Sequence, residues 1–266
     1  MTRSIRNLDL SEIATLLDWA AAEGWNPGIN DAPAFHAADP GGFFGTFVGG
    51  RMVAGIAAVA YDAHFGFIGL YICHPDWRGQ GHGKAVWDAG MAYLGSRTIG
   101  LDGVPEQQAN YASMGFVPAY ESVRMSGNIV STASLPAARL EDIGDLDLAC
   151  FPAPREAFLR HWLAPPNRSV VHRQHELVDA YAVLRPCRDG AKIGPMFARS
   201  VEGAIDLLET FSGRVHIDVP TTQMHWLDAL AARGFGPGFC TARMYRGRPP
   251  GIALDSVFGV TSLELG

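Results

Sequence analysis

Apolar positions recur at helical spacing near the start of the chain and then change to the runs that are typical of strands. Residues 10–25 carry apolar side chains three and four positions apart, which predicts a helix with Asp9 or Ser11 as its N-cap. Three β-rich runs follow: residues 43–48, 52–61 and 65–73. They predict an antiparallel meander that leads to a buried central strand.

A glycine-rich turn comes after the third run, and the pattern then alternates again. It predicts a helix, a short strand, a second helix and a returning strand: residues 84–94, 98–101, 106–114 and 116–125. The first half of the chain therefore combines helices with a sheet.

The second half repeats the closing part of the first. Both halves contain an Asp, a Val-Pro pair, a Gly-Phe pair and an Arg in the same order: Asp102, Val104-Pro105, Gly115-Phe116 and Arg124, then Asp218, Val219-Pro220, Gly234-Phe235 and Arg243. Two copies of one fold explain the repeat. The stretch 126–136 contains Gly, Ser and Thr without periodic apolar residues, so we predict two domains, residues 1–131 and 132–266.

Composition and charge narrow the class of protein. The chain has 266 residues, of which 48% are hydrophobic and 18% charged, so we expect packed cores. A net charge of −6 argues against a nucleic-acid partner. The four cysteines have no paired spacing, so we expect no metal. Without a signal-peptide pattern or a long apolar run, we expect a cytoplasmic protein that has no membrane partner.

The most informative chemistry lies where an apolar strand meets alternating glycines that open a helix. Gly79, Gly81 and Gly83 let the backbone turn tightly, and the free N–H groups at a helix start attract an anion. A Rossmann fingerprint would need a glycine in place of Lys84, and a Walker loop would need one in place of Arg78. What remains is Arg-x-x-Gly-x-Gly between a strand and a helix.

This pattern resembles the acetyl-CoA loop of GNAT-family N-acyltransferases. The segment 110–116, in which Tyr111 lies four residues before a Gly-Phe pair, resembles a later helix of that family. The chain as a whole is similar to tandem GNAT proteins related to the bacterial YitH group, most clearly at 101–108 and 258–266. The resemblance implies an α/β (α+β) fold of two GNAT-like domains, each a mixed, mostly antiparallel sheet flanked by helices, with acetyl-CoA as co-substrate.

The resemblance also implies roles for individual residues. Backbone groups of the strand would bind the pantetheine and the thioester, and the loop would hold the pyrophosphate. The cofactor-binding set it implies is Tyr71, Ile72, Cys73, Arg78, Gly79, Gln80, Gly81, His82, Gly83 and Lys84. Many family members carry an Asn seven residues before the tyrosine, where this chain has Val104; Gln107 and Gln108 are candidate substitutes.

Acyl transfer to an amine requires a base for the amine and an acid for the leaving thiolate. Tyr111 suits the acid, because a phenol with a pKa of about 10 stays protonated at neutral pH. Asp102 is the first candidate for the base, and its rivals are His74, Asp62, His64 and Glu121. The residues after the first helix lie where the resembled fold roofs the acceptor pocket, so the candidate substrate contacts are Trp25, Asn26 and Asp31.

We therefore predict a catalytic N-terminal domain that transfers the acetyl group of acetyl-CoA to a primary amine of a small molecule in a ternary complex. The C-terminal domain is predicted to be degenerate, because no glycine-rich turn follows Ile193-Gly194 and Leu230 stands at the tyrosine position. The alternatives are a non-catalytic acyl-CoA sensor and an enzyme that acetylates a protein amine. Whether the protein forms a homodimer is left open.

Overall fold

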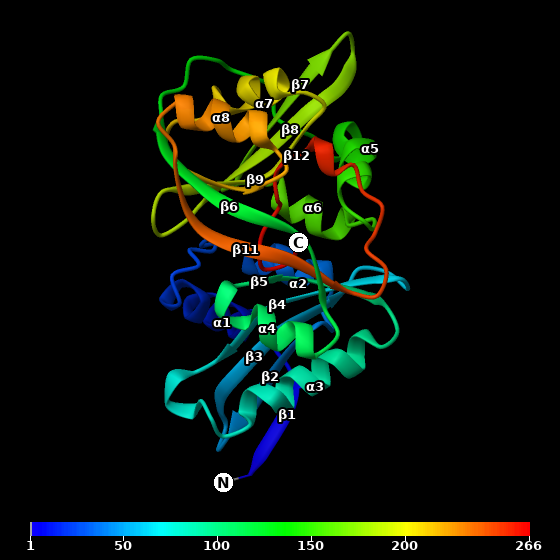
Figure 1. Cartoon of the computed structure of the whole chain (residues 1–266). Coiled ribbons are helices and arrows are strands. Elements are labelled where there is room, and N and C mark those ends of the chain that lie inside the picture. The colour runs from blue at the N-terminus through cyan, green and yellow to red at the C-terminus, as the bar shows by residue number, and fades with distance from the viewer. Residues whose placement is uncertain (1) are drawn as a thin grey trace.

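The first half of the chain alternates strands and helices in the predicted order (Figure 1). The computed structural model describes residues 2–266. The elements of this half are β1 (Arg3–Asn7), α1 (Leu10–Ala22), α2 (Ala32–Ala38), β2 (Phe43–Val48), β3 (Arg51–Ala60), β4 (Phe65–Cys73), the 3₁₀ turn η1 (Pro75–Trp77), α3 (His82–Leu94), β5 (Thr98–Gly103), α4 (Pro105–Ser113) and β6 (Val117–Ile129). β2 and β4 have the predicted bounds, and the other predicted elements differ by a few residues at their ends.

The second half follows the same plan. Its elements are α5 (Leu140–Cys150), α6 (Glu156–Trp162), β7 (Arg168–Gln174), β8 (Leu177–Pro186), β9 (Ala191–Ala198), α7 (Val201–Leu208), β10 (Gly213–Pro220), α8 (Met224–Ala232), β11 (Gly236–Arg246), the 3₁₀ turn η2 (Leu254–Ser256) and β12 (Val257–Gly259). Among the strands of residues 2–266, only β4 with β5 and β9 with β10 are parallel neighbours. The predicted α/β fold with a mixed, mostly antiparallel sheet is confirmed.

Local sequence chemistry sets the ends of α1. Asp9 is its N-cap, because the Asp9 carboxylate accepts from the Glu12 N–H at 3.0 Å and the Glu12 carboxylate accepts from the Asp9 N–H at 3.0 Å. The helix ends at Ala22, just before Gly24, which has a φ of +81°. The strand β1 was not predicted, because all five of its residues are exposed and it has no buried face to give a period.

The two halves exchange their closing strands. The sheet runs in the order β1-β2-β3-β4-β5-β11-β6-β10-β9-β8-β7, and β12 pairs with β9 off this path. β11, from the end of the chain, therefore pairs with β5 of the first half, while β6 pairs with β10 of the second half. One continuous sheet results. The division at residues 131 and 132 stays a prediction, and a cut there would separate paired strands.

Two reciprocal ion pairs join the exchanged strands and account for the sequence repeat. Arg243 stands opposite Asp102 in the register of β11 and β5, with Nε to Oδ1 at 2.8 Å and Nη2 to Oδ2 at 2.8 Å. Arg124 stands opposite Asp218 in β6 and β10, with the matching contacts at 2.7 Å and 3.0 Å. The repeated Asp and Arg of each half thus bind the Arg and Asp of the other half.

The sheet of the first half opens beside its central strand. β4 and β5 pair only from Phe65 to Ile68 on β4, although β4 continues to Cys73. Leu70 has a φ of +48°, and the register between β3 and β4 shifts at the same place, which marks a β-bulge. Unpaired backbone of β4 therefore faces the opening.

The last residues of the chain run between the two halves, where Figure 1 places the C-terminus. The glycines on the two central strands make room for this tail. A Cβ atom on Gly69 would lie 1.7 Å from the carbonyl oxygen of Glu264, and one on Gly194 would lie 2.4 Å from that of Thr261. The tail thus packs against both central strands through backbone contacts.

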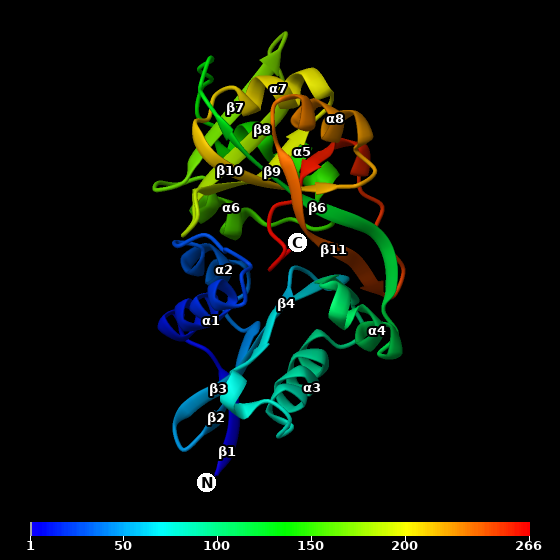
Figure 2. The same ribbon diagram turned by 60° about the vertical axis from the view of Figure 1, so that its left-hand side comes forward.

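Helices cover both faces of the first half, and one of these faces shares a core with the second half. Figure 2 shows α1 and α2 on one side of the strands and α3 and α4 on the other. α2 packs against α6, where the rings of Phe35 and Trp162 stack with their centroids 6.0 Å apart. Both side chains are fully buried, so the halves are held together by apolar packing as well as by the sheet.

Candidate active site

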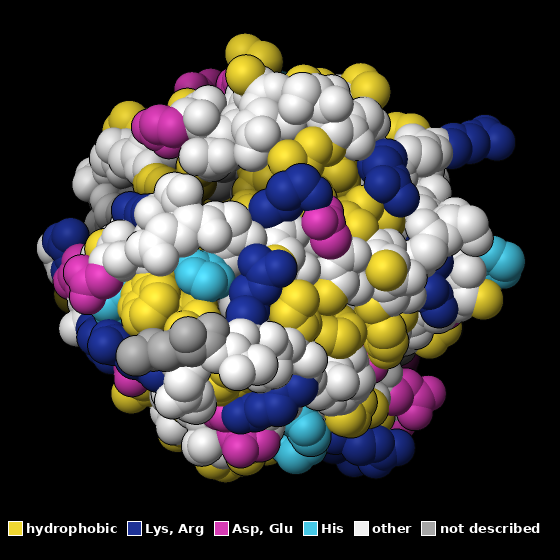
Figure 3. All heavy atoms as spheres, turned by 90° about the horizontal axis from the view of Figure 1, so that it is seen from below, with side chains coloured by type: hydrophobic (Ala, Val, Ile, Leu, Met, Phe, Trp, Pro, Cys, Tyr) yellow, Lys and Arg dark blue, Asp and Glu magenta, His cyan; other side chains and the backbone are white. Residues whose placement is uncertain are grey.

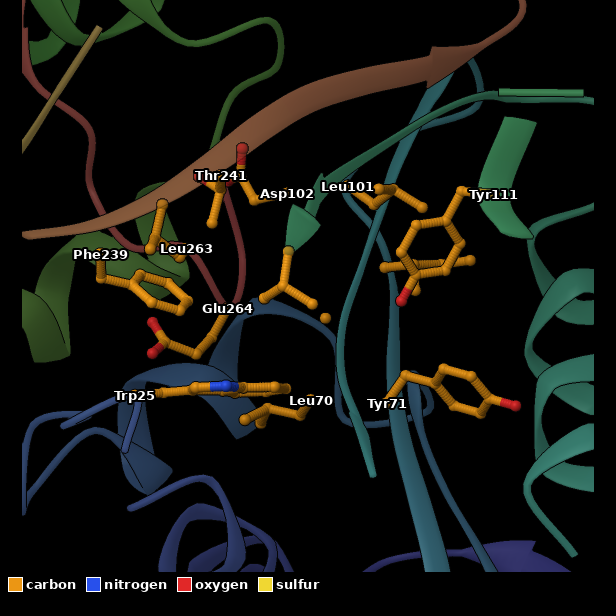
Figure 4. A pocket seen from close by; sticks show the side chains of 13 residues that line it. Trp25, Leu70, Tyr71, Leu101, Asp102, Tyr111, Phe239, Thr241, Leu263 and Glu264 are labelled. Carbon is orange, nitrogen blue, oxygen red and sulfur yellow. The ribbon is translucent and has the colours of Figure 1, made fainter. Parts of the chain in front are cut away.

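Two adjoining cavities lie where β4 and β5 separate (Figure 4). Six residues line both: Trp25, Tyr71, Asp102, Val104, Tyr111 and Phe239. The outer cavity is an open cleft that continues along β4 to Cys73 and Arg78 and is bounded on its other side by α4. The inner cavity has about 40 Å³ of space for water-sized molecules and reaches Leu263 and Glu264 of the C-terminal tail. The outer cleft leads from Arg78, at the start of the glycine loop, to the inner pocket, and residues 79–84 line neither cavity.

The glycine loop has the backbone that an anion cradle requires. Gly79 and Gly81 have φ values of +76° and +78°, and a Cβ on either would meet no atom within 4 Å, so open space lies beside them. Gly81 is the N-cap of α3 and makes no side-chain capping bond. Among residues 2–266, no side-chain oxygen accepts from the N–H groups of the first turn, and an anionic ligand fits there. The Gly83 N–H faces the Cys73 thiol and opposes the rise in its pKa.

The side chains of Arg78, Gln80 and Lys84 in the loop are bonded to the protein itself, whereas His82 Nδ1 has no hydrogen-bond partner among residues 2–266. Arg78 donates from Nε to the Cys73 carbonyl at 3.0 Å and forms an ion pair with Glu23. The Gln80 side chain donates to the Asp76 carbonyl at 3.2 Å, and Lys84 Nζ pairs with Asp88 at 2.6 Å. The buried His82 ring packs edge-on against Trp77 with centroids 5.5 Å apart. The backbone and the ring nitrogen of His82 are thus the polar groups of the loop that are left without a protein partner.

The strand before the loop contributes one wall of the cleft. Tyr71, Ile72 and Cys73 all line it. The Tyr71 ring packs on Trp87 with centroids 5.1 Å apart, and burial raises the pKa of its hydroxyl. Burial also raises the pKa of the Cys73 thiol, which therefore stays protonated at neutral pH.

Tyr111 is held on the wall between the two cavities. It lies on α4, its ring stacks on Trp87 with centroids 5.7 Å apart, and only 9% of the residue is exposed. Burial raises the pKa of its hydroxyl, with a smaller effect from Tyr71. The phenol therefore stays protonated at neutral pH, and its role as the acid stays a prediction.

Asp102 lines both cavities, but its carboxylate is already engaged. Both of its oxygens accept from Arg243, and the side chain is fully buried. Burial raises the pKa of the Asp102 carboxyl, and Arg243 opposes the shift. If Asp102 took a substrate proton, Arg243 would lose its partner, at a cost of about 3 to 5 kcal/mol. The geometry assigns Asp102 a structural ion pair rather than the predicted role of base.

Only one of the three candidate substrate contacts reaches the cavities. Trp25 lines both, and its carbonyl accepts from Arg124 at 3.1 Å and from Lys192 at 2.9 Å, so side chains beyond the first helix fix its position. Asn26 instead exchanges hydrogen bonds with the backbone of Asp189 at 2.9 Å and 3.1 Å. Asp31 is buried in an ion pair with Arg185 and lines neither cavity.

The four rival bases also lie away from both cavities. The Asp62 carboxylate accepts from the N–H groups of His64 and Phe65 at 2.7 Å each and so closes a turn. The His74 ring packs against Trp19 with centroids 5.5 Å apart. Glu121 is exposed on β6.

Other residues that line the inner cavity were not predicted by any sequence motif. They come from β11 and from the C-terminal tail: Phe239, Thr241, Leu263 and Glu264. The similarity of residues 258–266 to related proteins was the only sequence feature that pointed to a role for the tail.

The second half lacks an equivalent of the glycine loop. Its helix α7 has Ser200 as N-cap, and the Ser200 hydroxyl accepts from the Gly203 N–H at 3.1 Å. In α3, no side chain of the described residues accepts a hydrogen bond from the N–H at the corresponding position. Leu230, at the tyrosine position, is fully buried. That the second half binds no acetyl-CoA stays a prediction.

Comparison with known proteins agrees with this geometry. The model of the acetyltransferase (GNAT) family matches residues 10–117, and that of the acetyltransferase (GNAT) domain matches residues 143–259. The chain is 30% identical to the holothin acyltransferase of Pseudoalteromonas sp. (strain SANK 73390), over 97% of this chain and 92% of that protein. The chain therefore belongs to the GNAT family, as a tandem protein with two GNAT domains, and is an acyltransferase. Its grouping with YitH stays a prediction.

Solved structures share the fold. A putative acetyltransferase from Pyrococcus horikoshii superposes with a TM-score of 0.84 at 17% identity, covering 99% of this chain and 96% of that one. A tandem GNAT protein from the clavulanic acid biosynthesis pathway gives a TM-score of 0.63 at 16% identity, covering 93% and 100%. Among residues 2–266, no helix combines the length and the apolar character needed to span a bilayer.

Proposed function

We propose that the protein transfers the acetyl group of acetyl-CoA to the primary amine of a small molecule by direct attack in a ternary complex. The observation that carries this proposal is the junction of the open cleft and the inner pocket at the β4–β5 separation, with Tyr111 on the wall of both. A thioester that enters along the cleft and an amine held in the pocket would meet at this junction.

The cleft offers the contacts that CoA needs. The free N–H groups at the start of α3 suit a pyrophosphate, and the backbone of Tyr71 to Cys73, unpaired on the side of β5, suits the amide groups of pantetheine. Figure 3 shows basic and acidic side chains interspersed on the face seen from below. We therefore assign the attraction for the phosphates to the backbone of the loop rather than to a broad basic surface.

Tyr111 would act as general acid to the CoA thiolate. Its pKa is raised by burial, so the hydroxyl is protonated when the C–S bond breaks. Transfer of this proton to a thiolate, whose thiol has a pKa of about 8.5, is uphill, so it is completed by the proton that the attacking nitrogen returns to Tyr111. An amine with a pKa of about 10.4 must lose a proton before it attacks, which costs about 4 to 5 kcal/mol at pH 7.

A small amine fits better than a protein amine. The inner pocket is bounded by side chains from both halves, among them Trp25, Phe239 and Leu263. The pocket leaves only about 40 Å³ of space for water-sized molecules, so it favours a small acceptor. The holothin acyltransferase relative supports acyl transfer in general, and acetyl as the acyl group is part of the proposal.

Calorimetric titration with acetyl-CoA tests the cofactor half of the proposal. We expect one acetyl-CoA to bind per chain, and we expect Gly81→Glu to abolish binding, because a carboxylate would then stand in the cradle. Gly81 has a φ of +78°, so any side chain there also strains the backbone by about 1 to 2 kcal/mol.

The matched control is Gly95→Glu, at the other end of α3. Gly95 also has a positive φ, of +60°, and open space beside it, and its ψ of −126° is harder for a side chain to adopt than the ψ of 7° at Gly81. The substitution therefore adds the same charge and at least as much strain, away from the cleft. Binding that survives in the Gly95 variant and disappears in the Gly81 variant supports the site. A wild-type chain that binds no acetyl-CoA would overturn the proposal.

A further inference from the structure

The C-terminal tail brings a buried carboxylate to the inner pocket. Glu264 lines this pocket and is only 2% exposed. Its Oε2 has no hydrogen-bond partner among residues 2–266, and its Oε1 forms an ion pair with Lys192 Nζ at 3.9 Å, which is beyond hydrogen-bond distance. In Figure 4 the carboxylate lies beside the rings of Phe239 and Trp25. A buried acceptor left unpaired in this way points to a donor that a ligand supplies.

The position of Glu264 is fixed by the tail on both sides of it. The Ser262 hydroxyl accepts from the Leu265 N–H at 3.0 Å, and the Ser262 carbonyl accepts from the Gly266 N–H at 3.0 Å. The Tyr61 hydroxyl donates to the Leu265 carbonyl at 2.9 Å. Gly69 leaves room for the Glu264 backbone itself. The carboxylate is therefore held at the pocket by a built structure.

We propose, building on the proposed acyl transfer, that Glu264 binds the amino group of the acceptor and takes a proton from it. The acceptor is then a primary amine on a small, flat, apolar body that packs against the aromatic side chains beside the carboxylate, Trp25 and Phe239. The other carboxylate on the pocket wall, Asp102, is bonded through both oxygens to Arg243 and does not compete for the amine.

The proton transfers balance with Glu264 as base and Tyr111 as acid. The ammonium form of the acceptor gives one proton to the Glu264 carboxylate, and the neutral nitrogen bonds to the carbonyl carbon of the thioester. The C–S bond then breaks, its electron pair goes to sulfur, and sulfur takes the proton of Tyr111. The nitrogen loses its second proton, which restores Tyr111. The products are the amide, the CoA thiol and one proton, which Glu264 releases to solvent.

The two groups lie on different sides of the pocket. Figure 4 shows Tyr111 across the pocket from Glu264. A thioester carbonyl between the two side chains would receive the amine from one side and release sulfur to the other. This separation suits an acid and a base that act on opposite bonds of one carbon.

The test uses the full chain and three amine probes: benzylamine, 2-phenylethylamine and tryptamine. We expect wild type to acetylate at least one of them from acetyl-CoA, and we expect Glu264→Gln to lower kcat for that amine at least 50-fold with acetyl-CoA affinity unchanged within twofold. Glu264→Asp keeps the charge at a shorter reach, so it should recover part of the lost rate. With CoA bound, the same amine should bind Glu264→Gln at least tenfold more weakly than wild type.

Asp147→Asn is the matched control for loss of a buried carboxylate. Asp147 pairs with Arg155 and lines neither cavity, so this variant should lose stability but keep its kcat below its unfolding temperature. Full activity in Glu264→Gln would overturn the role of Glu264. A wild type that binds acetyl-CoA but acetylates none of the amines would overturn the acceptor class. A wild type that binds no acetyl-CoA would overturn the proposed function instead.

Discussion

At the scale of single residues, burial and partners decide which ionisable group can exchange a proton with a substrate. Tyr111 and Asp102 lie on the same pocket wall, and burial raises the pKa of both. The tyrosine keeps its proton and can still donate it. The Asp102 carboxylate is bound by Arg243, and this ion pair joins β5 to β11. The sequence shows Tyr111 and Asp102, but it does not show that Arg243 binds Asp102.

Tyr111→Phe should lower kcat by about 10²-fold to 10⁴-fold, the range typical of general acid catalysis. Acetyl-CoA affinity should change less than twofold, because the ring and its stack on Trp87 remain. Steady-state kinetics with any acetylated amine, together with calorimetry, measures both quantities. An unchanged kcat would contradict the role of the hydroxyl.

The same residue makes a prediction about pH. Since burial raises the pKa of Tyr111, its hydroxyl stays protonated above the ordinary phenol pKa of about 10. Wild-type kcat should therefore not fall between pH 8 and pH 10 through loss of this proton. A fall in that range that Tyr111→Phe removes would show instead that the tyrosine ionises there.

At the scale of elements, the bulged strand β4 and the C-terminal tail define the pocket together. Hydrophobic runs with turn signals at their ends gave the bounds of β2 and β4, because such signals are local. The same runs do not record that β4 leaves β5 after Ile68, or that the tail returns to Gly69. Those features depend on chain segments almost 200 residues away, so no local pattern predicts them.

Gly69→Ala should destabilise this contact. A Cβ atom would lie 1.7 Å from the Glu264 carbonyl oxygen, so the tail or the strand must shift. We expect a loss of about 1 to 3 kcal/mol in the free energy of unfolding, as for overpacked cores, and a lower kcat because Glu264 moves. Urea denaturation and steady-state kinetics measure the two effects.

Gly144→Ala is the control for this substitution. Gly144 lies in α5 with no atom within 4 Å of an added Cβ, so alanine should raise stability by about 0.5 to 1 kcal/mol and leave kcat unchanged. A stable, fully active Gly69→Ala chain would mean that the tail does not depend on this glycine.

At the scale of the whole molecule, the residues that repeat in the sequence are the ones that join the exchanged strands. The spacing of Asp102, Arg124, Asp218 and Arg243 revealed two related halves. It did not reveal that each Asp pairs with the Arg of the other half, because strand order is set by long-range pairing and not by spacing. The fold class was therefore predictable, while the origin of half of the pocket was not.

This arrangement predicts that residues 1–131 do not form a folded monomer on their own. Without β11, strand β5 would expose an unpaired edge and Asp102 would be buried without Arg243; without β10, strand β6 would lose its other neighbour. We expect the fragment to aggregate, or to pair with a second copy, when it is followed by circular dichroism and size-exclusion chromatography. Adding residues 132–266 as a separate chain should restore a one-to-one complex that binds acetyl-CoA. A monomeric fragment that binds acetyl-CoA alone would contradict the argument, because it would mean that the first half completes its own sheet.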